Sequence, residues 1–203
     1  MEHYTALSPY LKRRFGSKVY KLSLSAGCTC PNRDGTLGAR GCIFCSGSGE
    51  FAASGSASIP EQLEQAKYIL GKKAQGAKFI AYFQDYTNTY GAVSRLEPLF
   101  LAAMEPDDVV ALSIATRPDC LPEDILRMLA RLRAQKPVFV ELGLQTIHDN
   151  TAQYIRRGYP LSVFDDAVQK LHALDIEVIA HQILGLPGET AEMIVETTRH
   201  LGQ

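Results

Sequence analysis

The sequence predicts an α/β fold in which a parallel β-sheet alternates with helices. Three observations predict it: five short apolar runs of strand length, helix-like segments between them, and polar residues where nearly every run ends. Consecutive strand–helix units imply right-handed crossovers, and therefore parallel strands, in a sheet that is either open or curled toward a barrel.

The first two strand–helix units lie in the N-terminal half of the chain. Residues 19–25 form the first strand-like run. A helix is expected from Pro60, a residue that suits the first turn, to about Gly76, since glycine favours the exit of a helix. Residues 78–84 are expected as the second strand, and residues 94–104 as the helix that follows it.

Three further units complete the pattern. Each joins a largely apolar run, rich in β-branched residues, to a longer segment of helical character. The expected strands are 108–115, 138–144 and 176–183, and the expected helices are 122–135, 161–174 and one that begins at residue 189.

The composition favours an intracellular enzyme. The 203 residues suffice for one domain with a substantial core, 46% of them are hydrophobic, and the charges nearly cancel at a net −1. This balance argues against a generic polyanion binder, and the basic run at residues 12–14 is typical of a solvated surface. No secretory signal or membrane span is predicted, so we expect a cytoplasmic protein with a single domain over residues 1–203 and an N-terminal extension at residues 1–18.

Four of the five cysteines lie in one loop, at residues 26–50. Clustered thiolates favour zinc, copper(I) or iron–sulfur clusters. If Cys28 joins Cys30, Cys42 and Cys45, four thiolates would close a tetrahedral zinc site, which is the favoured interpretation by spacing alone. If three bind, a four-iron cluster keeps one iron open to an exogenous ligand. The loop directly follows a strand and opens a long strand–helix alternation, which favours an active site.

Polar residues that belong to or follow the other strands are candidates for the same site. The carboxyl ends of parallel strands share one edge of the sheet, which is the catalytic face in barrel enzymes. Each residue alone would fit a loop or capping role, whereas their joint placement predicts a functional site. These residues are Gln84, Asp85, Arg117, Gln145, His181 and Gly185.

Several motifs together resemble the radical S-adenosylmethionine (SAM) superfamily. Phe44 precedes the last cysteine of the loop, residues 141–146 read ELGLQT, and residues 183–189 read ILGLPGE. More closely, the runs CPNRDGTLGARGCIFC, YFQDYTNTY, ATRPDCLPED and ELGLQTIHDNT resemble the bacterial YhcC-like group, which is related to the catalytic subunit of Elongator. The resemblance extends over essentially the whole chain.

The resemblance implies an enzyme built on a partial (β/α)6 TIM-like barrel. Three cysteines would bind a 4Fe-4S cluster, and SAM would chelate the fourth iron through its amino and carboxylate groups. An electron from the cluster would then cleave SAM to methionine and a 5′-deoxyadenosyl radical, which takes a hydrogen atom from the substrate. A further implied partner is an electron donor such as flavodoxin or ferredoxin.

The site residues follow from their positions in these motifs. Cys30, Cys42 and Cys45 would be the cluster ligands. Cys28 stands where the family usually has an aromatic residue, so we interpret it as a bystander, and we interpret Cys120 as a buried thiol. The implied SAM-binding residues are Phe44, Gln84, Asp85, Arg117, Gln145, Arg157, His181, Ile183 and Gly185.

The resemblance also implies which part of SAM each contact would touch. Gln84 and Asp85 would lie near the methionine amino group, and Gln145 would touch the ribose or carboxylate. Arg157 suits the carboxylate because its rigid fork can bind both oxygens, although Arg156 beside it could exchange roles. The adenine would lie near Phe44 and the fifth-strand residues His181, Ile183 and Gly185.

The sequence leaves the substrate open. A small molecule and RNA are both compatible: the kinship to Elongator suggests RNA, whereas the net charge offers no electrostatic footprint for nucleic acid. A zinc-stabilised α/β binding module without catalysis is the alternative. The chain is also expected to be a fragment that ends after the fifth β/α unit, because the family continues through a sixth strand.

Overall fold

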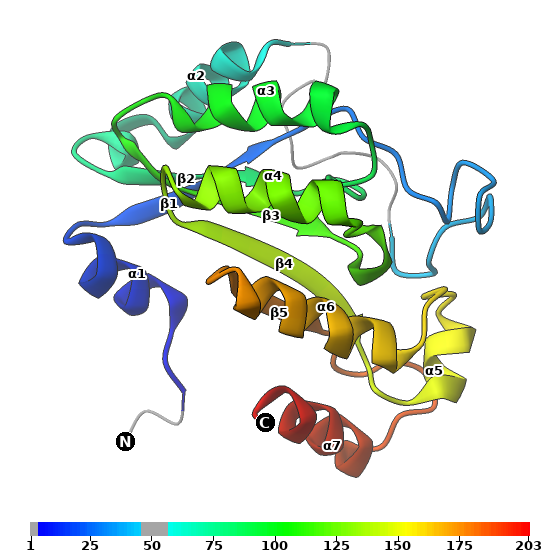
Figure 1. Cartoon of the computed structure of the whole chain (residues 1–203). Helices are drawn as coiled ribbons and strands as arrows, with labels where there is room; N and C mark the ends of the chain where they lie inside the picture. The colour runs from blue at the N-terminus through cyan, green and yellow to red at the C-terminus, as the bar shows by residue number, and fades with distance from the viewer. Residues whose placement is uncertain (1–3, 46–56) are drawn as a thin grey trace.

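Five parallel strands form one sheet in which the spatial order equals the order in sequence (Figure 1). The computed structural model describes residues 4–45 and 57–203. Neighbouring strands pair in parallel, and within the described residues the sheet has two open edges, formed by the first and last strands. The α/β class and the partial barrel are thereby confirmed. The strands are β1 (Val19–Leu24), β2 (Lys78–Phe83), β3 (Val109–Thr116), β4 (Val138–Gln145) and β5 (Glu177–Gln182).

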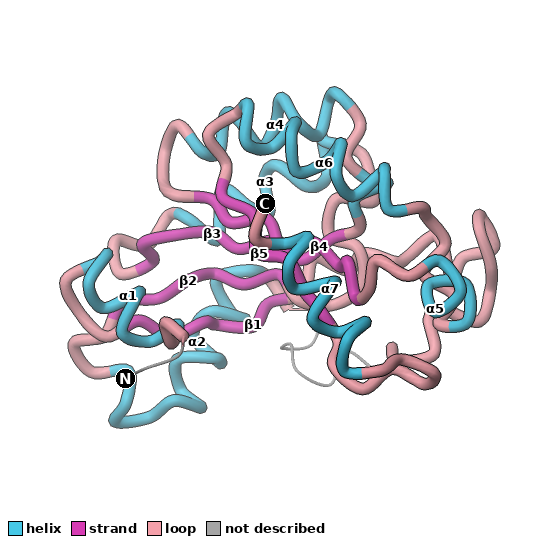
Figure 2. The backbone as a smooth tube through the Cα atoms, turned by 90° about the horizontal axis from the view of Figure 1, so that it is seen from below, coloured by secondary structure: helices cyan, strands magenta, loops and turns pink. Residues whose placement is uncertain are grey.

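Helices between the strands cover the outer face of the sheet. Leu22 of β1, Phe83 of β2 and Leu142 of β4 belong to one large apolar cluster with residues of these helices. Figure 2 shows α3, α4 and α6 together on one side of the sheet. This burial is the main driving force for the fold. The covering helices are α2 (Ile59–Leu70), α3 (Val93–Met104), α4 (Glu123–Arg133) and α6 (Leu161–Ala173).

The inner face of the sheet changes from apolar to polar along the strands. Side chains alternate between the two faces of a strand, so residues two apart share a face. The inner face begins with an apolar layer made of Val19, Ile80, Ala111, Phe139 and Ile179. Two residues further along each strand lies what we call the central polar layer, made of Lys21, Tyr82, Ser113, Glu141 and His181.

A helix in the predicted N-terminal extension covers the apolar layer. Helix α1 (Leu7–Phe15) inserts Leu11, which is 4% exposed, among the apolar residues of the inner face. At its C-terminal end Arg14 pairs with Glu177 of β5 at 2.5 Å. The helix therefore lies across the N-terminal end of the inner face and connects to the edge strand β5. Sequence analysis assigned no element here.

The other differences from the predicted elements are local. α2 ends at Leu70, where a short 3₁₀ turn (Gly71–Ala74) takes over the last part of the predicted helix. The six-residue helix α5 (Asp149–Tyr154) after β4 was not predicted. The last helix, α7 (Ala191–Leu201), begins where the Thr190 hydroxyl accepts a hydrogen bond from the backbone N–H of Met193. Of the predicted cluster loop, residues 46–50 lie outside the described residues.

Candidate functional site

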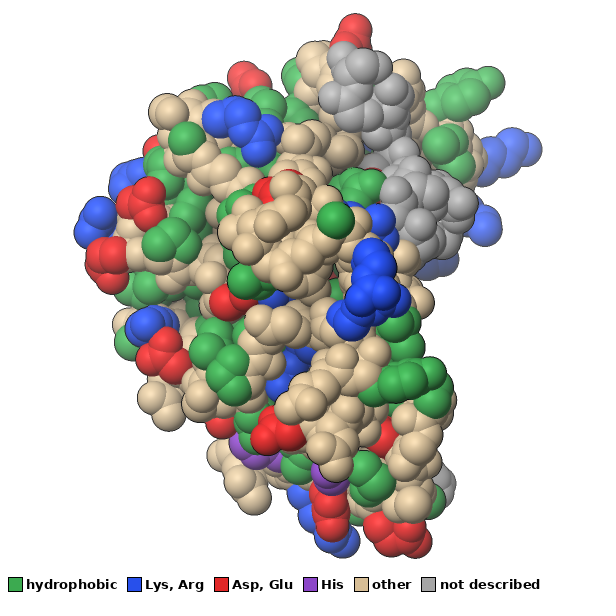
Figure 3. Space-filling view, turned by 90° about the vertical axis from the view of Figure 1, so that its right-hand side faces the viewer, with side chains coloured by type: hydrophobic (Ala, Val, Ile, Leu, Met, Phe, Trp, Pro, Cys, Tyr) green, Lys and Arg blue, Asp and Glu red, His purple; other side chains and the backbone are tan. Residues whose placement is uncertain are grey.

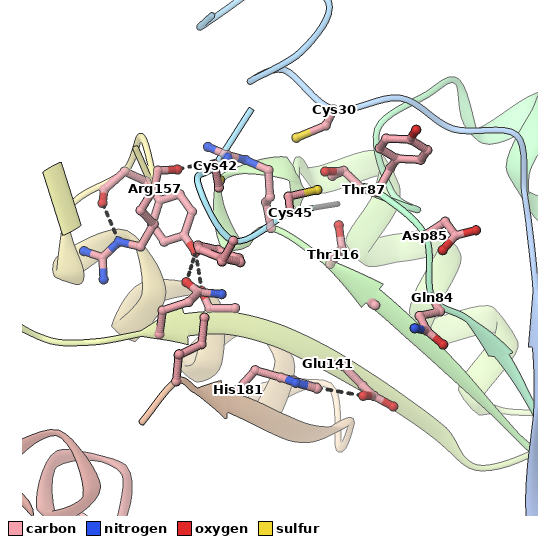
Figure 4. A pocket seen from close by; sticks show the side chains of 18 of the residues that line it. Cys30, Cys42, Cys45, Gln84, Asp85, Thr87, Thr116, Glu141, Arg157 and His181 are labelled. Atoms are coloured by element: carbon pink, nitrogen blue, oxygen red, sulfur yellow. Dashed lines mark hydrogen bonds and ion pairs between the residues drawn. The ribbon is translucent and has the colours of Figure 1, made fainter. Parts of the chain in front are cut away.

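A cavity of about 430 Å³ opens at the carboxyl ends of the strands and the loops that follow them. It is lined by all three predicted cluster ligands and by eight of the nine predicted SAM-binding residues. In Figure 4, Cys30, Cys42 and Cys45 lie at one end of the cavity, with Glu141 and His181 at the other. The predicted residues that line it are Cys30, Cys42, Cys45, Phe44, Gln84, Asp85, Arg117, Gln145, Arg157, His181 and Ile183.

Gly185 is the predicted site residue that does not line this cavity. It lies in the turn after β5, where it is exposed and has a φ of 83°. Glycine adopts this left-handed conformation without the steric penalty that a Cβ atom brings. In this structure, Gly185 therefore shapes the turn beyond Ile183.

The cysteine loop is held in place by Asn32. Its side-chain amide donates to the Cys42 sulfur at 3.2 Å and to the carbonyl of Arg156 at 2.8 Å. Burial raises the pKa of the Cys42 thiol, while the hydrogen bond from Asn32 works in the opposite direction. Asn32 thus joins the loop to the turn that follows α5.

Cys28 and Cys120 stand apart from the cavity. The Cys28 sulfur accepts a hydrogen bond from Arg95 at 3.0 Å. Cys120 is buried, and this burial raises its pKa to about 12. Neither residue lines the cavity. Among the described residues, no group of three His, Cys, Asp or Glu side chains is placed to hold a single metal ion.

The rim after β2 carries Gln84 and Asp85. The Ser23 hydroxyl donates to the side-chain oxygen of Gln84 at 3.2 Å, and burial raises the pKa of Asp85. The turn that follows is held by Asn88, whose amide donates at 3.0 Å each to the carbonyls of Phe83, Asp85 and Ala115. This explains part of the YFQDYTNTY run, since Asn88 fixes the backbone on which Gln84 and Asp85 are presented.

Arg117 is a buried cation beside the cysteines. Its guanidinium forms a forked pair with Asp119, at 2.9 and 2.7 Å, and donates to the carbonyl of Arg157 at 3.0 Å. The Asp119 carboxylate compensates the charge of Arg117, which a buried position would otherwise disfavour.

Arg157 has a different environment from the one expected for a ligand-binding arginine. Its side chain is 1% exposed and donates to the backbone carbonyls of Leu144, Thr146 and Tyr159. Figure 4 shows this guanidinium directed away from the cysteines. One of its nitrogens, Nη2, is buried with no partner among the described residues. In this structure Arg157 thus fastens the end of β4, whereas Arg156 lines a separate cavity of about 680 Å³.

The end of β4 is irregular at Gln145. This residue has a φ of 62°, and the pairing register with β5 shifts between Gly143 and Gln145. A Cβ atom on Gly143 would clash with the Gln145 side-chain nitrogen. Glycine at 143 therefore leaves room for the Gln145 side-chain amide to fold back over the strand. The Tyr159 hydroxyl lies 3.4 Å from the oxygen of this amide.

Glu141 is a buried carboxylate in the central polar layer. Its oxygens accept hydrogen bonds from Lys21, Ser113 and His181, the last at 2.8 Å. Burial alone would raise the pKa of Glu141, but the three hydrogen bonds lower it to about 2. The carboxylate is therefore ionised and fully surrounded by donors.

Sequence reasoning did not assign roles to Asn32, Tyr82, Glu141 or Tyr159, although the first three fall inside the quoted motifs. Their roles depend on partners far along the chain: Asn32 contacts a carbonyl 124 residues away, and Glu141 contacts a lysine 120 residues away. The signal available in the sequence was the polar residue itself. Glu141 interrupts an otherwise apolar strand, and a charged residue in such a run usually has a specific partner.

The family model of the radical SAM superfamily matches residues 32–201. This match begins within the cysteine loop, after Cys30, and spans all the later strands and the final helix. The chain belongs to the radical SAM superfamily. The expectation drawn from the motifs is thereby confirmed at the level of the superfamily.

Two curated relatives belong to the group that the motifs resemble. Protein YtqA of Bacillus subtilis (strain 168) is 43% identical over 200 residues, covering 98% of this chain and 62% of the relative. Protein YhcC of Escherichia coli (strain K12) is 40% identical over 197 residues, covering 92% of this chain and 62% of the relative. The chain therefore spans less than two thirds of the length of both relatives.

A solved structure supports the fold. Elp3 of the archaeon Methanocaldococcus infernus, with residues 1–46 deleted, matches with a TM-score of 0.61 at 20% identity. The match covers 91% of this chain and 42% of that chain. This likeness shows that the two chains share a fold. In the described part of the chain, no helix is long and apolar enough to cross a membrane.

Proposed function

We propose that this radical SAM protein is an enzyme that binds a 4Fe-4S cluster through Cys30, Cys42 and Cys45 and binds SAM in the cavity beside them. The observation that carries the proposal is that the three cysteines border one cavity with the polar strand ends, while Cys28 is turned to Arg95. When bound, the cluster supplies the electron that cleaves SAM reductively and so starts radical chemistry on a substrate.

The residues present fit these cofactors. Three thiols form a soft donor set, and a four-iron cluster with three thiolates keeps one iron available for SAM. The cavity has the size of a typical small-molecule site, in which a few polar groups fix the orientation of the ligand. Thiols must lose their protons to bind iron, and the Asn32 hydrogen bond to the partly buried Cys42 favours the thiolate.

The chain's own side chains would orient SAM. Gln84 and Asp85 offer acceptors from the rim after β2 for an amino group, and the partial burial of Asp85 strengthens its attraction to a cation. Phe44 and Ile183 offer apolar surface for a planar base. We assign Arg157 an indirect role, because its guanidinium holds the carbonyls of Leu144 and Thr146 and so fixes the strand end that presents Gln145.

The substrate would bind in the same cavity. Side chains of the sheet form the floor of this cavity, where they could contact a bound molecule. Figure 3 shows the face around the cysteine loop, where Lys and Arg side chains are interspersed with Asp and Glu. Such a mixed surface favours a substrate recognised inside the cavity over one held by a broad electrostatic field.

Titration of SAM into the anaerobically reconstituted and reduced protein tests the proposal. The electron paramagnetic resonance signal should change on addition of SAM, because SAM would ligate the open iron. The Gln84→Ala variant should bind SAM about 2- to 10-fold more weakly, the effect of losing one hydrogen bond. The matched control is Gln135→Ala, since Gln135 is exposed and outside the cavity. A spectrum that does not respond to SAM would refute the proposed site.

A further inference from the structure

The central polar layer occupies a position that barrel enzymes normally fill with branched apolar residues. Each of the five strands contributes one polar residue to it, directly above the apolar layer that α1 covers. Tyr82, Glu141 and His181 of this layer also line the cavity. Burying a charged residue costs free energy unless it has partners, so the layer requires an explanation beyond packing.

Glu141 is buried beneath its three donors and is not accessible to a ligand. One oxygen accepts from Lys21 and Ser113, the other accepts from His181, and the side chain is 1% exposed. An ionised carboxylate accepts hydrogen bonds and donates none. Glu141 can therefore influence a bound molecule only through the residues that it holds.

His181 is the partner that faces the cavity. Its side chain is 49% exposed, and its Nε2 lies 2.8 Å from Glu141 Oε2. Because the carboxylate can only accept, the proton of a neutral ring must lie on Nε2, which leaves Nδ1 as an acceptor. In the portion of the chain with described coordinates, no protein group is hydrogen-bonded to Nδ1. A carboxylate that fixes a histidine tautomer in this way is familiar from metal and catalytic sites.

We propose that Glu141 is a positioning residue that holds His181 with Nδ1 as a hydrogen-bond acceptor on the cavity floor, for a hydroxyl or amino group of the substrate in place of the adenine contact that the motif implies. The inference rests on the proposed function in one respect, namely that the cavity is the substrate site. It predicts that the floor distinguishes neutral hydrogen-bond donors from molecules of similar size that can only accept.

Nitrogen-15 NMR of the histidine-labelled, cluster-free protein tests both the tautomer of His181 and its dependence on Glu141. The His181 resonances are assigned by their loss in His181→Gln. We expect the wild-type ring to be fixed with the proton on Nε2, whereas in Glu141→Gln the two nitrogen shifts should move toward the tautomer mixture of a free histidine. Asp165→Asn is the matched control, because Asp165 pairs with His200 at 2.7 Å and should affect that ring alone.

Two small probes test the ligand class. Ethylene glycol carries hydroxyl donors, whereas 1,2-dimethoxyethane has acceptors only. Ethylene glycol should shift the His181 Nδ1 resonance in a saturable way, after correction for the exposed His172, and dimethoxyethane should not. An Nδ1-protonated wild-type ring, an unchanged ring in Glu141→Gln, or an equal response to both probes would each overturn the inference.

These outcomes are separable from those of the proposed function. The NMR measurements need neither cluster nor SAM, so a protein that fails to bind SAM can still fix His181, and the reverse can also occur. If Glu141→Gln does not fold, the tautomer of the wild-type ring and its response to the two probes still decide the question.

Discussion

At the scale of single residues, the five cysteines have the same side chain but lie in different surroundings. Three cysteines border the cavity, namely Cys30, Cys42 and Cys45. The Cys28 sulfur accepts a hydrogen bond from Arg95, and Cys120 is buried beside Asp119. The three cysteines that we propose as ligands are therefore distinguished from the other two by their placement. The resemblance to the radical SAM motif predicted the same division, because the family usually has an aromatic residue at position 28, whereas spacing alone favoured a four-thiolate site.

Cysteine substitutions test this division directly. Replacing Cys30, Cys42 or Cys45 by alanine should abolish the iron content and visible absorbance of the anaerobically reconstituted protein, because each removes one of three ligands. Cys28→Ala should leave both nearly unchanged, since it removes a partner of Arg95 and no ligand. Loss of iron in Cys28→Ala would instead revive the four-thiolate site.

The pKa of Glu141 makes stability depend on pH. Its pKa in the folded protein is about 2, lowered from an ordinary value of 4.5. As the pH falls, Glu141 is protonated at a higher pH in the unfolded chain than in the folded protein. The contribution of Glu141 to the free energy of unfolding is therefore present above pH 4.5 and is lost between pH 4.5 and 2. The loss should be about 3 kcal/mol, as an order of magnitude. Urea unfolding over this pH range should show that the free energy of unfolding depends more strongly on pH in the wild type than in Glu141→Gln. The same pH dependence in both proteins would contradict this prediction.

At the scale of elements, the site depends on contacts between loops that belong to different units. The cysteine loop is tied to the turn after α5 by Asn32, and Ile43 N–H donates to the carbonyl of Ile155 at 3.2 Å. Gly158 belongs to the same junction, because a Cβ atom there would lie 2.9 Å from the Asn32 side-chain oxygen. The loop that carries the thiols is thus shaped by residues more than a hundred positions later.

Breaking this junction should reduce cluster assembly without removing a ligand. Asn32→Ala removes the amide donor to the Arg156 carbonyl and one of two donors to the Arg157 carbonyl, which should destabilise the junction by about 1–3 kcal/mol. We expect less iron per chain after reconstitution, with the overall fold retained by circular dichroism. Arg40→Ala is the control, since Arg40 is exposed in the same loop. Full iron content in Asn32→Ala would show that the loop is held by other contacts.

Helix α1 should stabilise the sheet through Leu11. Leu11→Ala would leave a cavity against the apolar layer, and such truncations cost about 2–5 kcal/mol. Leu7 provides a matched control in the same helix because it is 51% exposed, so Leu7→Ala should have a small effect. Thermal unfolding measures both. Equal effects of the two substitutions would show that α1 is not packed on the sheet in solution.

At the scale of the whole molecule, the sequence predicted the strands and most helices because their apolar periodicity is local. It did not predict α1, whose role depends on contacts with β5, or α5, which is too short to show a period. The residues of the site were predicted from motifs, and the cavity brings nearly all of them together. Their partners were not predictable, because Glu141 with Lys21, and Arg157 with the carbonyls of β4, are contacts that exist only after folding.

The formation of 5′-deoxyadenosine tests the central claim most directly. The reconstituted protein is incubated anaerobically with dithionite and SAM, and 5′-deoxyadenosine and methionine are quantified by mass spectrometry. We predict that the wild type forms both products in equal amounts and that Cys42→Ala forms neither. A protein that carries its full iron content but yields no 5′-deoxyadenosine, or a Cys42→Ala variant that yields as much as the wild type, would contradict the assignment of this site.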